Sequence, residues 1–374
     1  MSGAASLQPP TSGTDAEDAA SLHVMAAAFA IEGDPRDISP LGRGLINETY
    51  ALTSGGQRYV LQRINPEVFP RPEQIMANLS ALSDFMRASG ASEPHLPRLI
   101  RTRQGQPFAS DRAGGLWRMM EFISDSRTLD RIEHPYQAHE VGRILGAFHR
   151  GLSELPVERL GLSLPGFHDT QEYLKRLRRQ VGGGDSLAAT EIGASLAFVD
   201  ERRGLAAILE TARRDGRLPT RVTHGDPKLD NILFSTDGRT AVALIDLDTV
   251  QPGLVHHDLA DCLRSCCNRR GEGENHTEEV RFDTRICANI LAGYARGAGD
   301  LLRREEIDFL YDAIRSMPFE LGLRFLLDHL QGDRYFRVTE PGENLRKAQV
   351  QFALTRSIEQ QEREIRSAIA DAFG

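Results

Sequence analysis

Four oxygen-bearing side chains cluster within a short part of the sequence. Asp226 and Asn231 lie in "VTHGDPKLDNILF", residues 222–234. Asp246 ends the next apolar run, and Asp248 follows it by two residues. Carboxylates that lie close together repel one another unless a cation lies between them. Mg²⁺ prefers such oxygen ligands and typically binds one or two carboxylates together with substrate phosphates. The sequence therefore predicts a magnesium site for a phosphate-bearing substrate, and a solvated polar turn is the alternative.

A β-hairpin would bring these residues together. Asp237-Gly238, a strong turn signal, separates the runs 231–234 and 241–246, which both have strand character. A hairpin closed at this turn places Asn231 opposite about Leu244, and Asp246 then shares their face about 7 Å further on because side chains alternate. We therefore expect Asn231 and Asp246 to bind the metal, with Asp248 as a further ligand. Asp226 would hang from the loop beside them.

The order and spacing of three of these residues resemble the catalytic set of the protein kinases. Here the three are Asp226, Asn231 and Asp246. The form HGD…N…IDxD is similar to that of the aminoglycoside phosphotransferase-like small-molecule kinases, which use ATP and Mg²⁺. The resemblance implies that Asp226 is the catalytic base. Lys228, two residues after Asp226, is a candidate for contact with the γ-phosphate.

A glycine-rich segment stands where a kinase covers the phosphates of ATP. "GRGLIN", residues 42–47, precedes a predicted hairpin and contains Gly42 and Gly44, but Asn47 replaces the third glycine of the kinase pattern. Asn tolerates a left-handed backbone, and its amide can donate to a phosphate. We therefore expect these three residues to bind nucleotide, and an ordinary turn is the alternative.

The next predicted strand carries Gln62 where kinases have the lysine that binds the phosphates. We expect an amide pair between Gln62 and Asn78, on the following helix, to replace the usual Lys–Glu ion pair. Mg²⁺ or another arginine would supply the missing charge. A half-exposed strand glutamine is the alternative. Backbone groups of Glu121, Phe122 and Ile123 stand where the adenine edge would bind.

Longer stretches of the chain resemble the N-acetylhexosamine 1-kinases. The matching stretches are "INETY", "RYVLQRINPEVFP", "FHDT", "RVTHGDPKLDNILF", "IDLDTVQPG" and "LGLRFLLDHLQGDRYF". The resemblance implies phosphorylation of the anomeric hydroxyl of N-acetylglucosamine or N-acetylgalactosamine, with ATP and Mg²⁺, and implies that Arg324 helps to bind the sugar. Leu45 and Ser265 stand where a bulkier His and an aromatic residue are expected. Both are therefore candidate acceptor contacts, and the identity of the sugar stays open.

Two of the expected acceptor residues have structural alternatives. Arg324 flanks the apolar stripe of its predicted helix and could instead extend its charge into solvent. His168 precedes Asp169, which forms a D-x-x-E capping pattern with Glu172, so this segment could simply begin a helix. Asp258, which follows the metal-binding strand, is expected to buttress the catalytic loop rather than to bind metal.

Two other functions stay open. One is a kinase for another small alcohol, such as a choline-like amino alcohol or an aminoglycoside, whose positive charge would need a carboxylate-lined pocket. The other is a kinase fold without catalysis that binds only a nucleotide or a partner. The presence of Asp226, Asn231 and Asp246 argues against the second.

The elements that must position these residues follow an unusual order. The first third reads as a short helix, a hairpin (45–53 and 58–64), a helix (72–89) and further strands, and helical patterns dominate from about residue 137, interrupted by β runs within 220–248. We therefore predict an α+β, two-lobed protein-kinase-like fold with a small antiparallel β N-terminal lobe and a large, mainly helical C-terminal lobe. The predicted parts are a disordered tail (1–17), an N-terminal nucleotide-binding lobe (18–123) and a C-terminal catalytic and acceptor-binding lobe (124–374).

Composition disfavours several classes of function. The 374 residues carry a net charge of −8, whereas nucleic-acid binding needs a basic surface. The early apolar run 24–31 falls far short of the roughly 20 residues that span a membrane. The four cysteines lack CxxC spacing, which fits buried thiols in a reducing cytoplasm. Zinc bound by His256, His257, Cys262 and Cys266 is the alternative. We expect a cytoplasmic monomer or weak dimer that acts on a small molecule.

Overall fold

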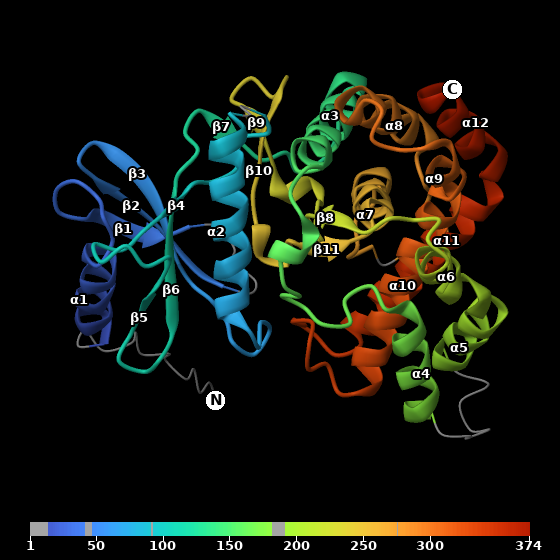
Figure 1. The fold of residues 1–374 in the computed structure, drawn as a ribbon. Helices are drawn as coiled ribbons and strands as arrows, with labels where there is room; N and C mark the ends of the chain where they lie inside the picture. Colours follow the sequence, from blue (N-terminus) through green and yellow to red (C-terminus); the bar gives the residue numbers. More distant parts are fainter. Residues whose placement is uncertain (1–13, 42–46, 91–92, 182–190, 275) are drawn as a thin grey trace, which may run out of the picture. The chain divides into compact units, whose positions relative to one another are not determined.

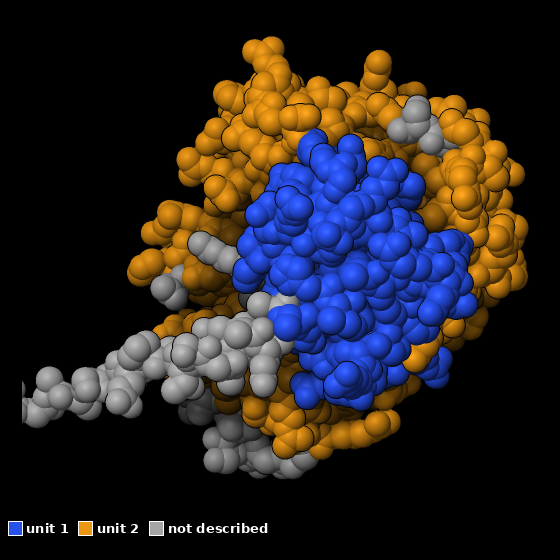
Figure 2. Space-filling view, turned by 90° about the vertical axis from the view of Figure 1, so that its left-hand side faces the viewer, with its two compact units in different colours: residues 1–72, 98–124 blue, residues 73–97, 125–374 orange. Residues whose placement is uncertain are grey.

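The computed structural model describes residues 14–41, 47–90, 93–181, 191–274 and 276–374 (Figure 1). The chain divides into two compact units, which Figure 2 shows in different colours. Unit 1 comprises residues 1–72 and 98–124, and unit 2 comprises residues 73–97 and 125–374. The predicted site residues Gly42, Gly44 and Leu45 lie outside the described residues.

Unit 1 is built on one antiparallel sheet, accompanied by helix α1 (Thr14–Ala27). Its strands are β1 (Arg36–Pro40), β2 (Glu48–Ser54), β3 (Gln57–Arg63), β4 (Leu99–Ile100), β5 (Ala109–Ser110) and β6 (Leu116–Glu121). The strand order is β1-β2-β3-β6-β4, and β5 also pairs with β6.

The hairpin predicted from the sequence is confirmed in unit 1. Ser54 pairs with Gln57, and the two glycines between them have φ values of 57° and 77°, which favour residues without a Cβ. Leu52 and Leu61 lie in the buried core of this unit. The sequence did not predict β1, whose five residues "RDISP" include proline and are mostly exposed.

Unit 2 is mainly helical. Its helices are α2 (Pro72–Ser89, whose first residue closes unit 1), α3 (Pro135–Gly151), α4 (Thr170–Val181), α5 (Glu191–Glu201), α6 (Ile208–Arg214), α7 (Val255–Cys267), α8 (Thr284–Ala298), α9 (Arg304–Asp308), α10 (Leu310–Leu330), α11 (Glu343–Gln360) and α12 (Glu362–Phe373). Its short strands are β7 (Ser126–Arg127), β8 (Arg221–Thr223), β9 (Ile232–Ser235), β10 (Ala241–Leu244) and β11 (Gln251–Gly253).

The strands of unit 2 form two small sheets that flank residues 224–231, the candidate catalytic loop. One has the order β10-β9-β7, and the other pairs β11 with β8. Both pairings place strand ends next to residues 224–231, so this segment starts from β8 and leads into β9. The predicted β runs are therefore confirmed, while β11 was not predicted.

Glycines on α3 and α8 let these two helices pack with their backbones in contact. A Cβ at Gly142 of α3 would lie 1.9 Å from a carbonyl oxygen of α8, and one at Gly293 of α8 would lie 1.9 Å from a carbonyl oxygen of α3. Any larger side chain would push the helices apart. This packing matters for the site because α3 carries His149 and α8 carries Tyr294, whose side chains meet.

Helix α10 supports the other half of unit 2. Its residues Phe319, Leu323 and Leu326 are fully buried in a core shared with α4, α5 and α11. Burial of these side chains fixes which face of α10 points away from that core. None of the helices that the structure describes is both long and apolar enough to cross a bilayer.

Candidate active site

The candidate catalytic loop contains a glycine that its backbone geometry requires. Gly225 has φ of +86°, and a Cβ there would lie 2.7 Å from the carbonyl oxygen of Thr249. The hydroxyl of Thr249 also donates to the carbonyl oxygen of His224, at 2.7 Å. The loop is thus held tightly against the segment that follows β10, and a larger residue at position 225 would disrupt both contacts.

Asp258 of α7 buttresses this loop, as the sequence predicted. Its carboxylate accepts hydrogen bonds from the backbone N–H groups of His224 (2.6 Å) and Gly225 (2.9 Å). It also contacts Nε2 of His149 at 2.9 Å, and Nδ1 of His149 contacts the hydroxyl of Tyr294 at 2.8 Å. Burial alone would raise the pKa of Asp258, but these hydrogen bonds hold it below its usual value.

His224 is buried and neutral. Burial lowers the pKa of its imidazole, against the opposing charges of Asp258 and Asp226. Its Nδ1 accepts the backbone N–H of Asp226 at 3.3 Å, and its Nε2 lies 3.0 Å from the carbonyl oxygen of Ile245. These partners assign the proton to Nε2. His224 therefore shapes the loop by linking its start to the end of β10.

The loop presents Asp226 with two close partners. Lys228 Nζ lies 2.7 Å from Oδ2 of Asp226. The amide nitrogen of Asn231 donates to the carbonyl oxygen (2.8 Å) and to Oδ2 (3.1 Å) of Asp226. Removal from water raises the pKa of Asp226, Lys228 partly offsets this, and the charge of Asp261 raises it further. A carboxylate with a raised pKa is a better proton acceptor.

These contacts assign roles to the atoms of Asn231 and Lys228. The Asn231 amide nitrogen is used by Asp226, so its oxygen is the atom that could bind a cation. Burial alone would lower the pKa of Lys228, but the carboxylates of Asp226 and Asp246 raise it above its usual value.

The predicted hairpin register is wrong by one residue. Leu244 pairs with Ile232, and the Ile245 N–H donates to the carbonyl oxygen of Asn231 at 2.9 Å. A bulge near Ala241 shifts the pairing, which the strict alternation of an ideal hairpin could not anticipate. Asp246, the next residue, is exposed and has a left-handed backbone with φ of 61°.

The residues present can accommodate Mg²⁺ only with help from phosphate. Among the described residues, no group of three or more His, Cys, Asp or Glu side chains could hold a metal ion. The Asn231 amide oxygen and the exposed Asp246 carboxylate fit a cation that takes most of its ligands from phosphate and water. Asp248 is 1% exposed and less accessible than Asp246.

Asn78, predicted to form an amide pair with Gln62, has every hydrogen-bonding group of its side chain occupied within unit 2. Its nitrogen donates to the carbonyl oxygens of Gly161 and Val250, both at 2.8 Å. Its oxygen accepts the side-chain amide of Gln74 at 3.0 Å and the backbone N–H of Gly161 at 2.9 Å. An amide with two donors and two acceptor sites has nothing left for another partner.

Gln62 instead pairs with an arginine that sequence reasoning missed. Arg118 is its cross-strand partner on β6, is 1% exposed, and donates to the Gln62 side-chain oxygen at 3.0 and 2.7 Å. The Gln62 nitrogen donates to Thr49 at 3.0 Å. The adjacency of strands β3 and β6 was needed to see this pair. Asn47 accepts the backbone N–H of Asn65 at 3.0 Å.

Backbone hydrogen bonds within unit 1 limit which of the predicted groups could bind the adenine edge. The backbone N–H of Glu121 donates to the carbonyl oxygen of Arg98 (2.9 Å), and that of Phe122 donates to the carbonyl oxygen of Arg58 (3.1 Å). Neither N–H group can serve adenine without breaking these bonds. The prediction therefore depends on backbone carbonyl groups and on Ile123.

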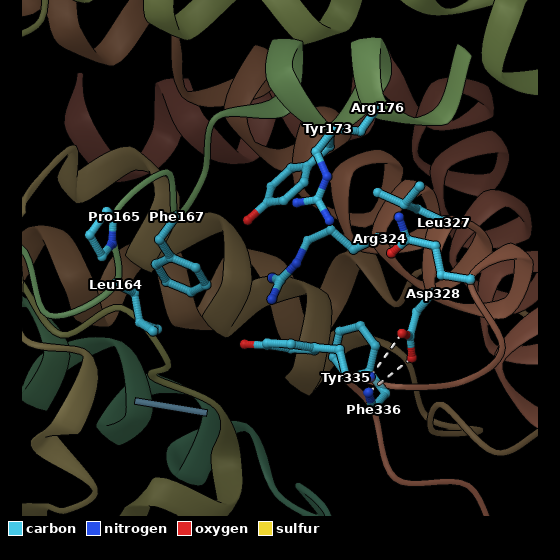
Figure 3. A pocket seen from close by; sticks show the side chains of 11 residues that line it. Leu164, Pro165, Phe167, Tyr173, Arg176, Arg324, Leu327, Asp328, Tyr335 and Phe336 are labelled. Carbon is cyan, nitrogen blue, oxygen red and sulfur yellow. Dashed lines mark hydrogen bonds between the residues drawn. The ribbon is translucent and has the colours of Figure 1, made fainter. Parts of the chain in front are cut away.

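A cavity of about 200 Å³ in unit 2 surrounds the predicted acceptor residue Arg324 (Figure 3). The guanidinium lies 5.2 to 5.9 Å from the centres of four aromatic rings. No hydrogen bond or ion pair joins it to the part of the chain that the structure describes. Burial alone would lower its pKa, but its neighbours, Tyr173 foremost, raise it. The cavity lining includes Phe167, Tyr173, Arg176, Arg324, Tyr335 and Phe336.

Of the other predicted acceptor residues, His168 and Ser265 do not line this cavity, and Leu45 lies outside the described residues. His168 has φ of +61°, and its Nδ1 lies 2.9 Å from the Glu320 carboxylate. Ser265 is half-buried on α7. The side chain of Asp169 accepts the backbone N–H of Glu172 at 3.0 Å, so the helix-start interpretation of this segment is confirmed.

Hydrogen bonds through the β11–β8 pair connect the lining of the cavity to the candidate catalytic loop. The backbone N–H of Leu164, which lines the cavity, donates to the side-chain oxygen of Gln251 at 3.0 Å. Gln251 pairs with Thr223, the residue before His224. The charge of Asp261 raises the pKa of both Asp226 and Arg324.

The zinc alternative finds no support in the described residues. All four cysteines are free and buried. His256 is also buried, and its Nε2 lies 2.8 Å from the carbonyl oxygen of Glu306. Burial lowers the pKa of His256 to about 4, from the usual 6.5.

His256 predicts a pH dependence of stability. Between pH 6.5 and 4 the unfolded chain binds a proton at this position that the folded chain rejects, so stability falls as the pH falls through this window. A single titrating group changes the free energy of unfolding by at most about 1.4 kcal/mol per pH unit. Urea denaturation at several pH values should show a shallower slope for His256→Gln than for the wild type. Equal slopes for His256→Gln and wild type would contradict the assignment.

Comparison with known proteins places the chain in a family. Residues 37–307 match the phosphotransferase enzyme family (APH). An aminoglycoside phosphotransferase from Alicyclobacillus acidocaldarius is similar in structure, with a TM-score of 0.58, 17% identity and 98% of each chain covered. A microcompartment-associated aminopropanol kinase has a TM-score of 0.62 and 18% identity, over 94% of this chain and 98% of its own.

A third structure shows the same fold with ligands bound. A spectinomycin phosphotransferase in complex with ADP and spectinomycin has a TM-score of 0.50 and 14% identity, over 92% of this chain and all of its own. These structural likenesses confirm the predicted α+β, protein-kinase-like fold. The family match over residues 37–307 shows that the chain belongs to the phosphotransferase enzyme family.

Proposed function

We propose that this protein transfers the γ-phosphoryl group of ATP, with Mg²⁺, to the anomeric hydroxyl of an N-acetylhexosamine. The observation that carries the proposal is the cavity around Arg324, which lies in the same unit as the catalytic loop. A guanidinium can donate to the carbonyl oxygen of an acetamido group. The surrounding rings offer flat apolar surfaces against which the face of a sugar can pack.

The proposed chemistry relies on positioning. Phosphoryl transfer passes through a loose transition state, so placement of the acceptor and neutralisation of charge dominate. Asp226 would orient the acceptor hydroxyl and accept its proton. Lys228, ion-paired with Asp226 at 2.7 Å, would add positive charge beside the reacting groups. Mg²⁺, held by Asn231 and Asp246 with Asp248 as a further ligand, would neutralise the phosphate oxygens.

The charges around the cavity support a neutral acceptor over a cationic one. Two guanidinium groups, those of Arg176 and Arg324, line it. Asp328 also lines it, but both of its carboxylate oxygens already accept hydrogen bonds from backbone N–H groups. A choline-like or aminoglycoside acceptor would need carboxylates that face it. The alternative of an amino alcohol or aminoglycoside kinase is therefore less consistent with this cavity.

The nucleotide contacts proposed for unit 1 have partial support. Asn47, the residue before β2, is fixed because its side-chain oxygen accepts the backbone N–H of Asn65. We propose that Arg118, acting through Gln62, supplies the positive charge that the missing lysine provides in other kinases. Gly42 and Gly44 remain sequence predictions, as does the adenine contact at Ile123.

A coupled assay of ADP release over a panel of acceptors tests the proposal. The panel would contain N-acetylglucosamine, N-acetylgalactosamine, simple hexoses, choline and an aminoglycoside. We expect release that depends on an N-acetylhexosamine and on Mg²⁺. Release with choline or the aminoglycoside alone would favour the alternative acceptors. Absence of acceptor-dependent release across the panel would contradict a sugar kinase.

Arg324→Ala should raise the KM for the sugar by at least about tenfold, because a charged hydrogen bond of 1.5 to 3 kcal/mol is lost. Arg178→Ala is a suitable control, because Arg178 lies on the outer side of α4 and pairs with Asp200. The KM for ATP should not change in either variant. An unchanged sugar KM in Arg324→Ala would contradict the proposed role of this residue.

A further inference from the structure

Three charged residues follow one face of α10 at intervals of four positions. They are Glu320, Arg324 and Asp328, and residues spaced in this way stack along a helix. The middle residue occupies the cavity, with aromatic rings around it. The outer two are buried carboxylates, 2% and 4% exposed. Burial of a carboxylate is unfavourable unless its oxygens are well bonded, so their partners indicate what they do.

Glu320 holds the segment that carries one aromatic wall. Its Oε1 lies 2.9 Å from Nδ1 of His168, and its Oε2 accepts the hydroxyl of Thr170 at 2.6 Å. His168 has a left-handed backbone, a strained conformation that persists only when its surroundings impose it. The preceding residue, Phe167, packs on His168 with ring centres 4.0 Å apart and faces Arg324. Glu320 thereby fixes the place of Phe167.

Burial alone would raise the pKa of Glu320, but the charge and hydrogen bond of His168 lower it to about 2. The carboxylate is therefore ionised over the whole pH range in which an enzyme assay is practical. It also contributes to the raised pKa of Arg324. The same carboxylate thus orders one wall and places a negative charge near the guanidinium of Arg324.

Asp328 holds the segment that carries the opposite wall (Figure 3). Its Oδ1 accepts the backbone N–H groups of Arg334 (3.0 Å) and Tyr335 (2.8 Å). Its Oδ2 accepts the N–H of Phe336 (2.9 Å) and the side-chain amide of Asn344 (3.0 Å). Three consecutive backbone groups are therefore gathered onto one carboxylate, which sets where the rings of Tyr335 and Phe336 lie.

We infer that Glu320 and Asp328 are positioning residues that determine acceptor specificity, each by holding one aromatic wall of the cavity against Arg324. This inference rests on the proposed function, since it takes the cavity as the acceptor site. The width of the gap between Phe167 and the Tyr335–Phe336 pair then selects the acceptor, while Arg324 binds its polar group. Neither carboxylate takes part in phosphoryl transfer, so loss of either should weaken acceptor binding without slowing turnover at saturation.

Steady-state kinetics of Asp328→Asn and Glu320→Gln test this inference. Each variant is expected to raise the KM for the N-acetylhexosamine by about tenfold, while kcat and the KM for ATP stay near wild type. Glu343→Gln is the matched control, because Glu343 accepts the backbone N–H of Thr339 near the far end of the same loop and does not line the cavity. A fall in kcat without a change in acceptor KM would overturn the inference.

A second variant tests whether the effect of Asp328→Asn could come from misfolding instead. Tyr335→Ala removes a ring that is 49% exposed, so folding should be unaffected, and it should raise the acceptor KM as Asp328→Asn does. If Asp328 acts through this ring, the double variant should raise the KM by less than the product of the two single effects. If the double variant raises the KM by the full product of the two single effects, Asp328 does not act through Tyr335.

Hydrogen exchange separates failure of this inference from failure of the proposed function, because it needs no acceptor. The amides of residues 334–336 should exchange at least about tenfold faster in Asp328→Asn than in the wild type or in Glu343→Gln. Unchanged exchange would overturn the anchoring, whatever the activity. Faster exchange in Asp328→Asn, combined with a wild type that phosphorylates no acceptor of the panel, would leave the anchoring intact but overturn the proposed function and the specificity role with it.

Discussion

Asp226→Asn is expected to lower kcat by about two to four orders of magnitude, the range typical for loss of a general base. The asparagine has nearly the same shape, so Asn231 can still bond to the backbone of residue 226. It cannot accept the proton of an acceptor hydroxyl, and it loses the ion pair with Lys228. Affinity for ATP should persist, because nucleotide binding is assigned to other residues. Single-turnover kinetics with separate measurement of ATP binding would distinguish these effects.

Asp230→Asn provides the control for that variant. Asp230 lies in the same loop but is exposed, and it has no proposed role. It should retain wild-type turnover. Near-normal kcat in Asp226→Asn, or an equal loss in Asp230→Asn, would remove the basis for Asp226 as the base.

Asp258→Asn should damage both activity and stability. Asparagine offers one acceptor oxygen where aspartate offers two, so at least one of the three hydrogen bonds from His224, Gly225 and His149 is lost. Loss of a partner from a buried charged network should lower the free energy of unfolding by about 3 kcal/mol. The loop that carries Asp226 would then shift, and a displacement near 1 Å can lower kcat by about a hundredfold.

Asp283→Asn separates the specific effect of Asp258 from a general loss of helix capping. Asp283 accepts two backbone N–H groups at the start of α8, so it has a similar local role away from the catalytic loop. Its replacement should lower the free energy of unfolding by at most about 1 kcal/mol and leave kcat unchanged. Denaturant titration together with kcat measures both effects. Wild-type kcat in Asp258→Asn would show that the loop does not need this anchor.

The fold was predictable where local patterns agree with it. Helix α2 spans Pro72–Ser89, as its periodic apolar residues predicted, and the two glycines after Ser54 close the expected hairpin. Strands β1 and β11 were missed for a physical reason. Each is short and contains proline, so its strand conformation comes from pairing with a neighbour rather than from its own residues.

The site was predictable only in part. The spacing of Asp226 and Asn231 within one loop is local, and the structure brings the two into contact. The side chains of Gln62 and Asn78, which we expected to pair, each have other partners within their own unit; hydrogen-bond satisfaction is a tertiary property that strand and helix order do not reveal. A bulge of a single residue was enough to shift the expected partner of Asn231.

The cavity was the part of the site that the sequence predicted least. Its rings come from two segments that are far apart in the chain, at positions 167 and 173 and at positions 335 and 336, and the two segments have no common motif. The resemblance indicated Arg324 alone. The neighbours of Arg324 follow from the way α4 and the loop after α10 are held by carboxylates on α10, and only the folded structure shows those bonds.

Phosphorus NMR of the reaction mixture tests the central claim most directly. The wild-type protein would be incubated with ATP, Mg²⁺ and an N-acetylhexosamine, with Asp226→Asn in parallel. We predict that the wild type converts ATP to ADP and a new phosphomonoester whose phosphorus couples to the anomeric proton of the sugar, and that the variant forms almost none. Release of inorganic phosphate alone, or equal product from both proteins, would contradict a sugar kinase that uses Asp226 as its base.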